Sequence, residues 1–191
     1  MTHSHAPARR HTHPQTHTVT IGVPRHWTTR SDPEHGLVLL ARPPTRTGEL
    51  GAAYGPELVV RTTPVDTDLA TWRAEAVAAL AAQLDAFEIE DDDRFELNGR
   101  AVVYHRLGYR ARGVDVVAEQ WAWLIDVPGA GGGIGVTLTG AVARSRYADY
   151  ADLFEEVAAT LDPGDAKESE DPGELSPAPA PGSAHPGEER W

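Results

Sequence analysis

Alternating hydrophobic and polar positions predict strands in the first third of the chain. Residues 18–23 (TVTIGV) alternate and are β-branched, and a proline follows them. A second apolar run covers 37–41, between a glycine and a pair of prolines, and a third covers 58–62. We therefore expect three short strands in these segments. The polar and glycine-containing stretch 45–55 is expected to be a loop.

Helical spacing replaces this alternation in two places. Apolar residues three and four positions apart form one stripe at Leu69, Trp72, Ala76, Leu80 and Leu84. Asp66 or Thr67 can cap the first turn of that helix. A second stripe comprises Tyr147, Tyr150, Phe154, Val157 and Leu161, and Pro163-Gly164 ends it.

Tight turns divide the segment between the two helices into strands. Asn98-Gly99 is a strong signal for a two-residue hairpin, and Arg112-Gly113 marks a further turn. Strands are expected at 101–109, 114–127 and 134–139. Strands and helices in separate blocks indicate an α+β fold with a mostly antiparallel sheet. Since both faces of 114–127 are apolar, helices are expected to flank the sheet on two sides.

Both ends of the chain are polar. Residues 1–16 lack an apolar run, and 162–191 are rich in Pro, Gly, Ala and acids, which favours disorder in both segments. The single domain is therefore expected to span 17–161. No segment has the composition of a secretory signal or a membrane helix, so we expect a cytoplasmic protein without membrane contact.

The charge and cysteine content exclude several classes of function. The chain has 17 basic and 29 acidic residues, and 17 − 29 gives a net charge of −12. This balance argues against nucleic-acid binding, which needs clustered cations. The chain contains no cysteine, so it has no disulfide, no thiolate metal site and no cysteine nucleophile.

Three segments could bind a metal ion or a phosphate group, but none has the residue pattern that such a site needs. The leader holds two His-x-His pairs, at His3/His5 and His11/His13, in a segment without fixed geometry. The acidic run 88–93 lacks the ligand alternation and central glycine of a calcium loop. We interpret it as a solvated hairpin tip that could contact a basic partner. The glycines of 129–133 precede no phosphate-binding helix. We therefore assign no metal or cofactor.

Single residues of the central strands complete the candidate set. His105 shares a strand face with apolar residues and is expected to be a packed or paired core histidine. Asp115 and Glu119 share one strand face, and we expect them to be solvated or paired with Arg106 or Arg110. Trp121 and Trp123 share a face and are expected in the core. No catalytic residue is assigned.

Several short motifs together resemble one known superfamily. They are the opening VTIGVPRHW at 19–27, LNGRA at 97–101, EQW at 119–121, the Thr-containing strand 136–139 and the final helix with Tyr150, Phe154 and Leu161. Spanning 18–161, they are similar to the PsbP-like fold. That superfamily includes PsbP, the Ran-binding import factor Mog, DcrB- and LpqN-type bacterial proteins and Eag-type effector chaperones. The resemblance implies an α+β fold, and most members act by binding other proteins.

Three hypotheses about function follow. The first is a non-enzymatic protein-binding module, an adaptor or chaperone-like protein, that uses an acidic or aromatic patch on a sheet edge or hairpin. The alternative is a small-ligand-binding protein or enzyme that uses a cleft between sheet and helix. A deep cavity containing His105 with Asp115 or Glu119 would favour this alternative. In the third, the tail 162–191 makes the contact. The patterns name neither a partner nor an oligomeric state.

Overall fold

A computed structural model describes residues 9–12 (by their backbone), 18–44, 54–127 and 132–164 of the 191-residue chain. Of the two His-x-His pairs, only His11 falls within these ranges. Most of the expected loop 45–55, most of the glycine segment 129–133 and the tail from 165 onward lie outside the described residues. The predictions for those segments therefore stay predictions.

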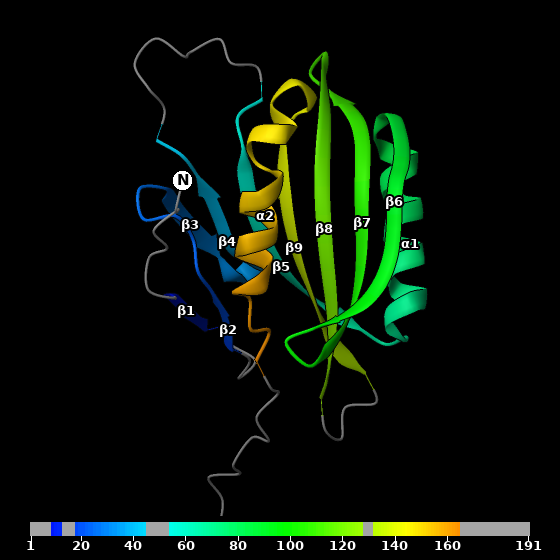
Figure 1. Ribbon diagram of the computed structural model, residues 1–191. Helices are drawn as coiled ribbons and strands as arrows, with labels where there is room; N and C mark the ends of the chain where they lie inside the picture. The colour runs from blue at the N-terminus through cyan, green and yellow to red at the C-terminus, as the bar shows by residue number, and fades with distance from the viewer. Residues whose placement is uncertain (1–8, 13–17, 45–53, 128–131, 165–191) are drawn as a thin grey trace, which may run out of the picture.

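A seven-stranded antiparallel sheet forms the centre of the molecule (Figure 1). Its strand order is β3-β4-β5-β9-β8-β7-β6. The strands are β3 (Thr28–Asp32), β4 (Leu37–Arg42), β5 (Glu57–Val65), β6 (Asp85–Leu97), β7 (Arg100–Ala111), β8 (Val114–Asp126) and β9 (Gly133–Ala143). A separate two-stranded sheet pairs β1 (Arg9–Thr12) with β2 (Thr18–Ile21). The expected α+β architecture with a mostly antiparallel sheet is confirmed.

The two long helices lie on opposite sides of the sheet, as expected. Helix α2 (Ala151–Ala159) lies in front of the sheet in Figure 1, and α1 (Leu69–Gln83) lies behind β6. We call the α2 side the front face and the α1 side the back face. The remaining helical segments are the 3-10 helices η1 (Pro33–His35) and η2 (Arg144–Asp149), the second of which leads into α2. No helix of the described residues is long and apolar enough to cross a membrane.

Two glycines of β9 make room for the helices. A Cβ atom on Gly140 would lie 2.6 Å from the Phe154 ring of α2, and one on Gly135 would lie 2.5 Å from the Trp72 ring of α1. Each ring therefore packs directly on the backbone of β9, on opposite faces. Because side chains alternate along a strand, the odd spacing of five residues places the two glycines on opposite faces.

The main core lies between the front face, α2 and the N-terminal segment. Its largest fully buried side chains include Trp123, Phe154, Ile21, Leu39, Leu58 and Leu138. Trp121 and Trp123 are both buried in it, so their expected core position is confirmed. The asparagine-glycine and arginine-glycine turns also form as expected, with positive φ at both residues of each turn.

The N-terminal segment is joined to the end of the domain. Thr20 and Asp162 exchange two backbone hydrogen bonds, of 2.9 and 2.8 Å. The amide of Gly22 donates to Thr160 Oγ1 at 2.9 Å. The ordered domain therefore continues past residue 161 to at least Gly164.

Three expectations about elements need correction. Residues 9–12 form β1, because an extended segment can satisfy its backbone groups by pairing with the edge of β2. Strand β3 was not predicted, because it is exposed on both faces and shows no alternation. The strand expected at 58–62 corresponds to β5, which continues through Pro64 to Val65.

The acidic run is not a hairpin tip. Residues 88–93 lie within β6 and pair with β7 in antiparallel register. Acidic side chains are compatible with this position because β6 is the last strand of the sheet, where charges hinder unwanted edge pairing. The closing helix also differs, since Tyr147 lies in η2 and the α-helix begins only at Ala151.

Candidate functional site

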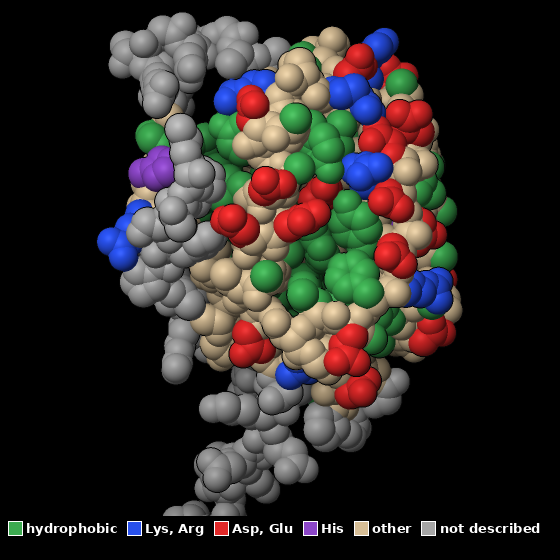
Figure 2. All heavy atoms as spheres, in the orientation of Figure 1, with side chains coloured by type: hydrophobic (Ala, Val, Ile, Leu, Met, Phe, Trp, Pro, Cys, Tyr) green, Lys and Arg blue, Asp and Glu red, His purple; other side chains and the backbone are tan. Residues whose placement is uncertain are grey.

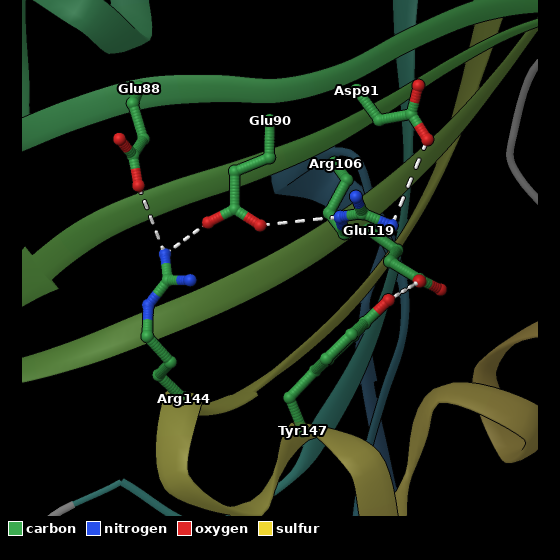
Figure 3. Close-up of polar contacts among 7 residues, drawn as sticks. All are labelled: Glu88, Glu90, Asp91, Arg106, Glu119, Arg144 and Tyr147. Atoms are coloured by element: carbon green, nitrogen blue, oxygen red, sulfur yellow. Dashed lines mark hydrogen bonds and ion pairs between the residues drawn. The ribbon is translucent and has the colours of Figure 1, made fainter.

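A network of ion pairs covers one end of the front face (Figure 3). Arg144 of η2 reaches across the sheet to β6, where its Nη2 donates to Glu88 Oε1 at 3.3 Å and to Glu90 Oε1. On β7, Arg106 Nε donates to Glu90 Oε2 at 3.3 Å, and its Nη1 lies 3.8 Å from Asp91 Oδ2. Glu90 is thus held between two guanidinium groups from two different elements. We call these five residues the ion-pair network.

The strand beneath the network leaves room for it. A Cβ atom on Gly108 would lie 2.5 Å from Arg144 Nη2 and 2.7 Å from Glu90 Oε1. The lack of a side chain at Gly108 therefore allows the Arg144–Glu90 pair to lie flat on β7. A shift in register between Ile89 and Asp91 also lets Glu90 and Asp91 approach the same arginine.

A buried carboxyl group lies next to the network. Glu119 of β8 is only 1% exposed, and its Oε1 accepts a hydrogen bond from the hydroxyl of Tyr147. Its Oε2 atom has no hydrogen-bond partner among the described residues. Burial raises the pKa of Glu119, while the hydroxyls of Tyr147 and Tyr104 act in the opposite direction. Burial together with Glu119 raises the pKa of Tyr147 to about 12.

A row of aromatic rings continues from Glu119 along the front face to the sheet edge. The Trp121 and Tyr104 ring centroids lie 5.4 Å apart, and those of Tyr104 and Phe95 lie 6.3 Å apart. Trp121 is buried, Tyr104 is half-buried and Phe95 is 38% exposed. This aromatic row is therefore anchored in the core at one end and open to solvent at the other.

Figure 2 shows how side chains of each type are distributed over the front face. Hydrophobic side chains gather in the middle of the front face, and acidic side chains border them along the side formed by β6. Figure 1 shows that α2 does not extend over β6 and β7. On the front face of β6, Asp93 and Phe95 are exposed, whereas Val102 and Gly108 of β7 are buried.

A second polar group lies on the back face, under α1. Arg73 is buried there, stacks 5.3 Å from the Trp72 ring centroid and donates to Gln120 Oε1 at 2.7 Å. Burial lowers the pKa of Arg73 to about 10. His105 is also buried, and its Nε2 lies 3.6 Å from Asp92 Oδ1. Burial, assisted by Arg73, lowers the pKa of His105.

The structure separates the residues that a catalytic cleft would have joined. His105 lies opposite Gln120 on the back face, whereas Glu119 lies opposite Arg106 on the front face. Asp115 has the same parity as Glu119, so the sheet lies between His105 and both carboxylates. The combination that would have favoured a ligand-binding cleft or an enzyme is therefore not assembled.

The individual expectations for these residues have mixed outcomes. His105 is a packed histidine paired with Asp92, as expected. Asp115 pairs with Arg110 at 2.9 Å, also as expected. The expectation for Glu119 is wrong, because Glu119 is buried and its carboxylate accepts a hydrogen bond from Tyr147.

The front face combines acidic, basic and aromatic side chains. Its carboxylates are held mostly by arginines and phenols, and the described residues contain no group of three or more His, Asp or Glu that could hold a metal ion. Arg144 and Gly108 were not predicted from the sequence, and Tyr147 was predicted only as part of the apolar stripe of the closing helix. The only sequence signal for their contacts was a glycine at an interior strand position, which often marks a close approach by other atoms.

Comparisons with known proteins place the fold. No protein-family model and no curated protein matches the chain. Among solved structures, LpqN of Mycobacterium tuberculosis, described as involved in cell envelope biogenesis, is similar with 18% identity and a TM-score of 0.59. The match covers 83% of this chain and 93% of LpqN. Cyanobacterial PsbP from Synechocystis sp. PCC 6803 matches with 13% identity and a TM-score of 0.52, covering 81% of this chain and 91% of that protein.

Proposed function

We propose that this chain, which has the PsbP-like fold, is a non-enzymatic protein-binding module whose contact surface is the front face of β6 and β7. The observation that carries the proposal is the aromatic row, which leads from the core to an exposed phenylalanine beside the ion-pair network. Partly exposed aromatic side chains with buried support are the residues that contribute most to protein interfaces.

Rigidity of this surface supports the proposal. Tyr104 is held against Trp121, and Glu90 is held by Arg106 and Arg144. A side chain that is already ordered loses less conformational entropy on binding than a free one. The front face of β6 and β7 is therefore prepared for a contact before a partner arrives.

The charge of the surface restricts the partner. Strand β6 alone contains seven acidic residues and one arginine. Two arginines compensate only some of these acids, so the rim of the face stays negative. A partner with a basic rim around an apolar centre would be electrostatically complementary.

Capture experiments with the full chain test this proposal. The bait is immobilised and exposed to native lysate, as wild type and as Phe95→Asp. We expect a protein that the wild type retains and that Phe95→Asp binds at least roughly 30-fold more weakly, because loss of an aromatic anchor costs about 2 kcal/mol or more.

A matched variant controls for the added negative charge. Ser31→Asp adds the same charge at an exposed position of β3, at the opposite edge of the sheet from β6, and should leave retention unchanged. Circular dichroism should show that both variants stay folded. A partner that Phe95→Asp retains as well as the wild type does would place the contact elsewhere, including the tail 162–191.

A further inference from the structure

The outer side of β6 has unused hydrogen-bonding capacity. Among the described residues, strand β6 pairs only with β7 and ends the seven-stranded sheet. Register shifts interrupt its first half, but the pairing from Asp91 to Leu97 is unbroken. Within that segment every second backbone N–H and C=O points away from β7. These seven regular residues thus present outward backbone groups to another strand, although the Arg94 N–H already donates to Asp93 Oδ1 at 2.7 Å and an added strand would have to displace that hydrogen bond.

The large exposed hydrophobic side chains also gather on this strand. Among the described residues, Ile89 is 50% exposed and Phe95 is 38% exposed, and no other large hydrophobic side chain is as accessible. Ile89 lies opposite Leu107 on the back face, whereas Phe95 lies opposite Val102 on the front face. A partner resting on one face would cover only one of them. A strand added along 91–97 places side chains on both faces and covers Phe95, whereas Ile89 lies beyond the register shift that precedes this segment.

The negative charge of the β6 edge determines which partner strands can pair with it favourably. Asp91, Asp92, Asp93 and Glu96 lie in the regular segment with a single arginine. Asp93 and Glu96 have no cationic partner among the described residues, and burial lowers the pKa of the His105 that lies near Asp92. Like charges placed directly opposite each other destabilise a strand pair, so a second copy of β6 is disfavoured. A basic strand is favoured for the same reason.

We infer that the β6 segment 91–97 binds a basic, extended segment of a partner protein as an additional strand of the sheet. This inference rests on the proposed function and specifies how the partner engages the edge. Side chains directly opposite each other share a face. The bound segment therefore carries cations opposite Asp93 and Glu96 and an apolar side chain opposite Phe95.

A synthetic peptide tests this inference without knowledge of the natural partner. The probe is a capped seven-residue peptide of lysines and valines, with lysines opposite the carboxylates and valines opposite Phe95 and Leu97. Two further versions carry N-methyl groups on either the odd or the even residues. Successive N–H groups of a strand point to opposite sides, so only one set donates to β6. Calorimetry with the full-length protein measures the affinity of each version.

We expect one methylated version to bind like the unmodified peptide and the other to bind at least about tenfold more weakly. Amide hydrogen exchange of the segment 91–97 should slow with the unmodified peptide. Equal binding of both methylated versions would show that the peptide binds without backbone hydrogen bonds to β6, and it would overturn the inference. No binding of the unmodified peptide at millimolar concentration would also overturn it.

Protein variants assign the binding to the edge. Asp93→Lys/Glu96→Lys should weaken the peptide by at least about tenfold, because it places like charges opposite the lysines. Glu34→Lys/Asp126→Lys changes the net charge equally at exposed positions off β6 and should bind as the wild type does. Equal loss in both double variants would contradict a specific edge contact.

The outcome is separable from that of the proposed function. Capture that depends on Phe95, combined with a peptide that shows no dependence on the methylation pattern, would keep the binding face and reject strand addition. Sedimentation could instead show that the wild type is a dimer and that Asp93→Lys/Glu96→Lys is a monomer. That result would mean that the β6 edge binds a second copy of the chain, and it would overturn the inference.

Discussion

Glu119 shows how one buried carboxyl group links stability to pH. Because burial raises its pKa above the ordinary value of 4.5, the folded protein keeps a proton that the unfolded chain has already released. Stability contributed by the protonated form is therefore fully present below about pH 4.5 and decreases as the pH rises toward the folded-state pKa.

Replacing Glu119 with glutamine should remove this dependence. Glutamine keeps an oxygen that accepts the Tyr147 hydrogen bond but carries no charge at any pH. We expect Glu119→Gln to gain stability relative to the wild type between pH 4.5 and neutral pH, by about 1.4 kcal/mol for each unit of pKa elevation. Urea unfolding at a series of pH values measures the difference.

A second variant serves as the control for burial. Asp115→Asn removes an exposed carboxylate from the same strand face, where it pairs with Arg110, and so measures the effect of losing a carboxylate that is not buried. A stability difference for Glu119→Gln that stays constant with pH would show that the folded and unfolded states titrate Glu119 alike.

The wrong expectation for Glu119 has a simple physical cause. Alternation along β8 correctly placed Asp115 and Glu119 on one face of the sheet, but it cannot tell what lies above that face. Tyr147 reaches Glu119 from η2, and Glu119 is buried whereas Asp115 is exposed. Residue-level burial of a polar side chain therefore depends on tertiary packing that a single strand does not encode.

At the scale of elements, the strands with one buried face were predicted and the edge strands were not. Central strands β8 and β9 have apolar faces packed beneath helices, so their hydrophobic runs are visible in the sequence. Edge strands β3 and β6 expose residues on both faces and show little alternation. The acidic run was assigned to a hairpin tip for this reason. The ion-pair network depends on β6 and was missed with it.

The junction between α2 and the N-terminal segment gives a second prediction. Thr160→Val removes the oxygen that accepts from the Gly22 amide and leaves that N–H without its partner. We expect a loss of about 1–3 kcal/mol in the free energy of unfolding, the usual cost of an unsatisfied polar group. Thermal or urea unfolding followed by tryptophan fluorescence measures it.

Thr137→Val serves as the control for this junction. Thr137 is half-buried on β9, and valine suits a strand position there. Its unfolding free energy should stay close to that of the wild type. A Thr160→Val protein as stable as the wild type would mean that the Gly22 amide finds another acceptor.

At the scale of the whole molecule, long-range pairings govern folding. Strand β5 pairs with β9 across the intervening helix and three strands, and Thr20 pairs with Asp162 near the other end of the domain. Loop closure over such separations must precede the gain from pairing. We expect refolding in milliseconds to seconds, measurable by stopped-flow fluorescence of the buried tryptophans. Refolding complete within microseconds would contradict this reasoning.

The overall architecture was the most accurately predicted level. Blocks of strands and helices, two hairpin turns and an apolar central strand together indicate an α+β fold with helices on both sides, and all three features are present. These signals are redundant, since each follows from burial or turn geometry over many residues. The front-face site has no comparable redundancy, because it depends on single side chains meeting from four elements.

The two glycines of β9 fix the register in which this strand can pair with its neighbours. Gly135 admits the Trp72 ring from the back and Gly140 admits the Phe154 ring from the front. A slip of β9 by one residue would turn both glycines to the wrong faces and drive side chains into both rings at once. The pairing register of β9 therefore determines how both helices pack, and a shifted register would cause a steric clash on each face of the sheet.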